Sequence, residues 1–81
     1  MSEEMARRQL TQANEYIAQA EQYIAVQEEI LTQLEDTGHD TRAAQALLVT
    51  LINTWQILHV HRKLLLRELA TIASIKSASV G

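Results

Sequence analysis

The chain contains no proline and only one internal glycine, Gly38, so only one point in its 81 residues favours a break in a helix. Proline and glycine interrupt helices more strongly than any other residues, whereas Ala, Leu, Gln and Glu, which are abundant here, favour them. We therefore predict an all-α fold with one helix over residues 3–36, a turn over 37–40 and a second helix over 41–72. Strands have little to form from.

The residues at the expected helix ends agree with this division. Ser2 can cap the first helix with its hydroxyl, and the two glutamates that follow suit the positive end of the helix dipole. Gly38 can take the left-handed conformation that closes a helix, and Asp40 or Thr41 can cap the next one. A turn this short makes the two helices antiparallel neighbours. The segment 74–81 is small and polar, and we expect a flexible tail.

Both predicted helices carry a heptad seam of apolar residues, spaced alternately by three and four positions. The first seam comprises Leu10, Ala13, Ile17, Ala20, Ile24, Gln27, Leu31 and Leu34. The second comprises Ala44, Leu48, Leu51, Trp55, Leu58, Arg62, Leu65, Leu69 and Ile72. We expect Gln27, Thr54 and Arg62, polar residues that interrupt this apolar surface, to set register and partner choice at some cost in stability.

The apolar surface is wider than one helix pairing can cover, because large residues flank both seams. Ile57, Val60 and Leu64 extend it further around the second helix. A second copy would cover much of it by forming a homodimeric four-helix bundle. The residues that we expect at that interface are Tyr16, Tyr23, Ile30, Leu47, Leu51, Ile52, Trp55, Leu58, His61, Leu65 and Leu66.

Charge is distributed unevenly along the chain. Residues 3–36 hold eight acids against two arginines, a balance of −6, and the rest has a balance of +3. In a hairpin the basic residues gather at the open end and the acids near the turn. Two such rods attract each other head to tail, although exposed charges are screened over about 8–10 Å. The sequence therefore predicts an antiparallel dimer.

His59 and His61 are the residues that most resemble a chemical site. On a helix they point about 160° apart, so they cannot chelate one ion as a pair spaced by four residues can. We expect His61 to lie within or beside the interface, level with Tyr16, and His59 at its edge. Two-helix ferritin-like iron proteins need Glu-x-x-His, and Gln56 and Leu58 stand at the corresponding positions. We predict no catalytic, cofactor-binding or metal-binding residue, and therefore no enzyme.

Several other classes of protein fit the composition poorly. The absence of cysteine removes disulfides and thiolate metal sites. The basic cluster is small and has no interleaved aromatic residues, which argues against nucleic-acid binding. The apolar stretch 46–60 is interrupted by polar residues and is shorter than the roughly 20 residues of a membrane span. The acidic, polar start is unlike a secretory signal, so we expect a cytoplasmic protein.

Several short motifs are familiar. Leu34-x-x-x-Gly38-His39-Asp40-Thr41, Ala46-Leu47-Leu48 and His61-Arg62, followed by Leu65 and Glu68-Leu69, resemble a group of short bacterial helical-hairpin, coiled-coil proteins. The likeness covers residues 13–69. That group often has an acidic residue soon after the Asp-Thr cap, where this chain has Arg42 and Ala43. The resemblance implies a small cytoplasmic bacterial protein and brings no activity with it.

These observations predict a non-enzymatic protein-interaction or scaffolding module that acts as a homodimer. The alternative is a histidine-dependent phosphotransfer or metal-binding helical protein, although a phosphoacceptor histidine usually lies on the first helix of a hairpin. A third reading is that an unidentified protein partner supplies the missing apolar surface.

Overall fold

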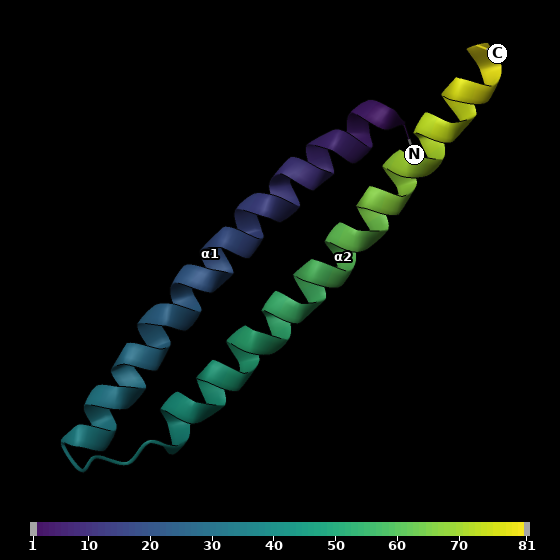
Figure 1. Ribbon diagram of the computed structural model, residues 1–81. Coiled ribbons are helices and arrows are strands. Elements are labelled where there is room, and N and C mark those ends of the chain that lie inside the picture. The colour runs from purple at the N-terminus through teal and green to yellow at the C-terminus, as the bar shows by residue number, and fades with distance from the viewer. Residues whose placement is uncertain (1, 81) are drawn as a thin grey trace.

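The protein is a long hairpin of two helices, seen in a computed structural model that describes residues 2–80. Helix α1 (Glu3–Asp36) and helix α2 (Arg42–Val80) lie side by side and run in opposite directions (Figure 1). The rod measures 67 × 15 × 14 Å. The prediction of an all-α antiparallel hairpin is confirmed. Residues 1 and 81, at the ends of the predicted hairpin and tail, lie outside the described part.

The two ends of α1 are capped as their residues predict. At the start, the hydroxyl of Ser2 accepts a hydrogen bond of 3.2 Å from the backbone N–H of Met5. At the end, Gly38 has a φ of +71°, the left-handed conformation that glycine adopts most easily. The N–H of His39 then donates to the carbonyl of Leu34 at 2.9 Å, and that of Gly38 donates to Glu35 at 3.2 Å. This pair of bonds is a Schellman motif, which satisfies carbonyls that the helix leaves open.

The start of α2 uses both residues that were predicted as caps. The Asp40 carboxylate accepts the backbone N–H of Arg42 at 3.0 Å and forms an ion pair with its guanidinium at 2.7 Å. These bonds lower the pKa of the Asp40 carboxyl below its usual value, the side-chain bond contributing most. The Thr41 carbonyl accepts the N–H of Gln45, the first bond of the helical ladder.

Helix α2 extends further than its sequence suggested. We predicted an end near residue 72 and a flexible tail over 74–81, whereas the helix continues to Val80. The predicted end is wrong by about two turns, because small polar residues such as Ser77 and Ser79 do not stop a helix without a glycine or proline. This extension projects past the start of α1 (Figure 1). It is joined to α1 by a contact between the Lys76 ammonium and the Glu3 carboxylate.

The core is a narrow layer between the two helices, formed by the predicted seams. On the α1 side the most buried apolar residues are three alanines and Ile17. Every residue of both seams is buried or half-buried. The buried apolar residues are Ala6, Ala13, Ile17, Ala20 and Leu65. No large apolar side chain among the described residues is fully buried, so most of each helix still faces outward.

Polar contacts between the helices fix their register. The Arg62 guanidinium donates from Nε to Oδ1 of Asn14 at 2.7 Å, and Nε2 of Gln27 donates to the carbonyl of Ala44 at 3.0 Å. Gln27 and Arg62 therefore bridge the helices, as a role in register requires. Thr54 does not, since its hydroxyl donates to the Thr50 carbonyl of its own helix.

Helix α2 is long and apolar enough over Arg42–Ser79 to cross a membrane, judged by length and composition alone. One such helix is weak evidence of a span, because core helices pass the same test. Only 6% of its most apolar window is buried within the hairpin, however, so α1 leaves most of this apolar surface uncovered.

Candidate interaction surfaces

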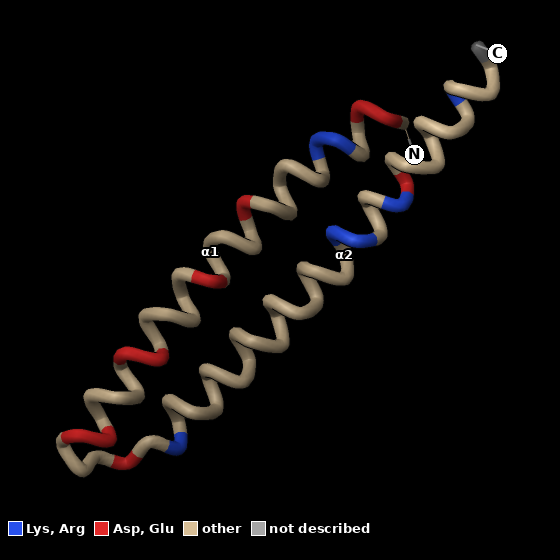
Figure 2. Tube along the Cα trace, in the orientation of Figure 1, with Lys and Arg blue, Asp and Glu red and all other residues tan. Residues whose placement is uncertain are grey.

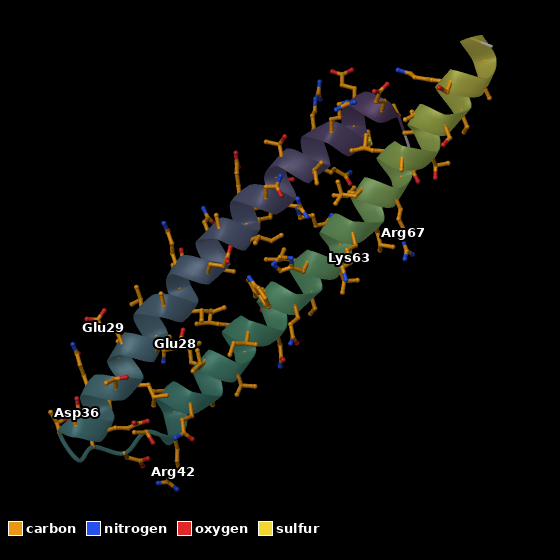
Figure 3. The ribbon with its side chains drawn as sticks, viewed as in Figure 1. Glu28, Glu29, Asp36, Arg42, Lys63 and Arg67 are labelled. Atoms are coloured by element: carbon orange, nitrogen blue, oxygen red, sulfur yellow. The ribbon has the colours of Figure 1, made fainter. Side chains whose placement is uncertain are left out.

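Charged residues avoid the middle of the hairpin on the α2 side. No Lys, Arg, Asp or Glu occurs between Arg42 and Arg62, whereas acids are spread along α1 as far as the turn (Figure 2). Glu28 and Glu29 point in different directions, and Lys63 and Arg67 lie on the side of α2 turned away from α1 (Figure 3). The long uncharged segment of α2 therefore presents exposed apolar side chains, Leu47, Val49, Ile57 and Val60, with no charged residue between them in sequence.

One flank of the hairpin carries an apolar groove between the helices, which we call the tyrosine face. It is lined by Tyr16, Gln19, Ala20 and Tyr23 of α1 and by Leu51, Thr54 and Leu58 of α2. Positions seven residues apart share a side of a packed helix. Ile30 therefore extends this face beyond Tyr23, and Leu47 and His61 extend it on either side of Thr54. None of these side chains is a carboxylate, lysine or arginine.

The opposite flank, which we call the tryptophan face, combines apolar and acidic residues. Its groove is lined by Glu21, Ile24, Ile52 and Trp55. The rings of Trp55 and His59 meet edge to face, with centroids 4.4 Å apart and an interplanar angle of 69°. Trp55 Nε1 and His59 Nε2 are buried and have no hydrogen-bond partner. This flank is therefore partly closed by its own aromatic pair.

A third apolar strip, the outer face, runs along the side of α2 away from α1. Asn53, Gln56, Ile57 and Val60 line it. Ile57 is 68% exposed and Val60 is 58% exposed, more than most other large apolar residues in the described chain. The predicted interface did not include these residues, although their helical spacing places them on one side of α2.

The predicted interface residues are divided between two faces and the core. Leu65 is only 3% exposed and is packed between α1 and α2, so it belongs to the hairpin core. Three of the residues, Ile52, Trp55 and Leu66, lie on the tryptophan face. The tyrosine face holds Tyr16, Tyr23, Ile30, Leu47, Leu51, Leu58 and His61. The heptad spacing could have predicted this division. It shows on which side of its seam each residue lies, and in an antiparallel pair of helices residues on corresponding sides share one face of the hairpin.

The two histidines have different environments in the hairpin. His59 is half-buried against Trp55, whereas His61 is exposed. Where each lies relative to a dimer interface stays a prediction. The Tyr16 hydroxyl, level with His61, accepts from Nε2 of Gln12 at 2.9 Å. Within residues 2–80, no three His, Cys, Asp or Glu side chains form a group that could hold a metal ion.

No protein-family model matches the chain, and neither a curated protein nor a solved structure matches it. The resemblance to bacterial helical-hairpin proteins therefore stays a prediction, and the exposed faces of the hairpin are what bear on function.

Proposed function

We propose that this chain is a non-enzymatic protein-interaction or scaffolding module that acts as a homodimer, with two hairpins joined in a four-helix bundle. The observation that supports this most is an excess of exposed surface. The hairpin exposes 6120 Å², whereas a compact monomer of 9.1 kDa exposes about 4,900 Å². The excess of about 1,200 Å² exceeds the roughly 800 Å² that each partner buries in a standard protein interface.

The exposed side chains give this area an energetic weight. Tyr16 is 46% exposed, Tyr23 61% and Leu47 49%. Full burial of a large apolar side chain contributes about 1.5–3 kcal/mol, so covering the exposed half of four such residues contributes about 3–6 kcal/mol. A chain of this length has a total stability of only about 4–12 kcal/mol. The free energy gained by self-association is therefore comparable to the total stability of the folded chain.

The mass of the purified chain in solution tests the proposal. We expect sedimentation equilibrium at micromolar concentration to give about 18 kDa, twice the chain mass of 9.1 kDa. A fully helical, cooperatively unfolding species of single-chain mass under these conditions would contradict the proposal.

Replacing both histidines distinguishes this proposal from the rival function, histidine-dependent phosphotransfer or metal binding. We expect the His59→Gln, His61→Gln double variant to keep the dimer mass and the helical circular dichroism of the native chain. We also expect the native chain to bind no Zn²⁺ in calorimetry and to gain no phosphoryl group from acetyl phosphate. Zinc binding or phosphorylation that the double variant loses would favour the rival function.

A further inference from the structure

We infer that the second copy docks on the tyrosine face, head to tail, with Thr54 of the two copies meeting near the two-fold axis. This inference rests on the proposed function, because it specifies the surface and orientation of the same homodimer. It is carried by the chemistry of the three faces and by the positions of the charges.

The tyrosine face is the only one of the three faces that spans both helices without a charged residue in its groove. A dimer built on it covers α1 and α2 together, including Tyr16 and Tyr23. Two of the polar groups on it already make hydrogen bonds within the chain. The Thr54 hydroxyl donates to Thr50, and the Tyr16 hydroxyl accepts from Gln12. These two groups therefore keep a hydrogen bond within the chain when the face is buried.

The charges favour the head-to-tail orientation. The turn end, residues 28–42, holds five acids and one arginine, a balance of −4. The open end, residues 3–8 with 62–76, holds six basic and three acidic residues, a balance of +3. A two-fold axis across the rod lays the turn of one copy on the open end of the other. Opposite charges then meet at both ends of the bundle.

The same axis explains why the tryptophan face is the poorer choice. The groove on the tyrosine face lies close to the middle of α1. A two-fold axis that crosses the rod at this height, within the interface, packs α1 against α1 of the other copy and α2 against its α2. On the tryptophan face, this operation would set the Glu21 carboxylate near the Glu21 carboxylate of the other copy. Like charges brought together out of water disfavour that pairing. Docking on the outer face would cover α2 alone and leave both tyrosines exposed.

Three consecutive residues of α2 provide matched probes of the three faces. Ile52 lines the tryptophan face, Asn53 the outer face and Thr54 the tyrosine face, all at nearly the same height on the rod. The chain has no cysteine, so each single substitution creates one thiol without background. A disulfide requires Cα atoms about 4.4–6.8 Å apart, which restricts it to residues close to the axis.

We expect Thr54→Cys to form a disulfide-linked dimer at least tenfold faster than Ile52→Cys or Asn53→Cys under the same mild oxidation, as read on non-reducing gels. Faster linkage through Ile52→Cys or Asn53→Cys would overturn the choice of face. If the native chain sediments as a dimer but Thr54→Cys does not link, the docking geometry is wrong and the proposed function stands. If the native chain sediments as a folded monomer, the proposed function fails and the inference fails with it.

A charge variant tests the face independently of disulfide geometry. We expect Thr54→Lys to weaken the dimer at least tenfold in sedimentation, because two ammonium groups would meet near the axis. Asn53→Lys, one residue away on the outer face, is expected to leave the dimer dissociation constant within twofold. Equal effects of the two lysines, with helical circular dichroism retained in both, would overturn the docking on the tyrosine face.

Discussion

At the scale of single residues, Gln27 shows how a polar side chain serves an apolar seam. It is only 7% exposed, and its amide reaches across to the carbonyl of Ala44 on the other helix. That carbonyl lies in the first helical turn of α2. Its position along the rod is therefore set by the length of the connection between the two helices. Because the bond needs one alignment of the helices, Gln27 selects the register that an apolar residue would leave to packing alone.

We expect Gln27→Leu to raise the free energy of unfolding by about 1 kcal/mol, since an apolar side chain gains more from this burial than an amide does. Gln27→Ala, the control, removes the hydrogen bond without replacing the buried surface, and we expect it to lower that free energy by about 1 kcal/mol. Urea denaturation followed by circular dichroism measures both. A Gln27→Leu variant less stable than the native chain would mean that the bond to Ala44 outweighs apolar packing.

At the scale of elements, α2 is longer than α1, and an ion pair joins its C-terminal turns to the start of α1. The Lys76 ammonium contacts the Glu3 carboxylate, which also accepts from Arg7 at 3.1 Å. The Lys76 and Arg7 hydrogen bonds lower the pKa of the Glu3 carboxyl, Lys76 contributing most. A lowered carboxyl pKa stabilises the folded hairpin above the ordinary pKa of the group, and this contribution is lost as the pH falls through the lowered value.

We expect Lys76→Gln to raise the pKa of Glu3 toward its ordinary value and to weaken the loss of stability on acidification. The carboxyl carbon of Glu3, followed by NMR through a pH titration, reports this directly. Lys63→Gln is the control, because Lys63 is exposed on the side of α2 away from α1 (Figure 3). A Glu3 pKa that is the same in the native chain and in Lys76→Gln would contradict the contact.

At the scale of the whole molecule, the hairpin is a rod with more apolar surface than its own core can use. Two helices share one thin layer of contact, so a rod 67 Å long has a high ratio of surface to volume. A second rod laid along it would add another layer of helix contact. Its orientation then depends on the charges at the two ends of the rod.

A distance measurement between the two turns distinguishes the orientations. With a spin label at His39→Cys in both copies, a head-to-tail dimer separates the labels by about 50 Å, the length of the 34 residues of α1 at 1.5 Å each. We expect pulsed electron paramagnetic resonance to give this distance, and the same label in a Thr54→Lys background to lose the dipolar signal. A main distance below about 20 Å, in keeping with adjacent helices, would show that the turns lie at the same end.

The sequence by itself determined the local features of this protein. The single internal glycine placed the turn, Ser2 and Asp40 marked helix starts, and the heptad spacing identified both seams down to the buried Gln27. These signals are readable because helix periodicity and capping depend on residues within a turn or two of each other.

Only the tertiary structure decided how the remaining apolar residues are shared. It showed how much of each side chain the two helices cover, leaving Leu65 3% exposed and Tyr23 61% exposed. It also showed α2 continuing to Val80, where Lys76 meets a residue from the other end of the chain. The exposed fraction of each flanking side chain and the contacts at the end of α2 depend on residues far away in sequence. The spacing of apolar residues within one helix does not specify those contacts.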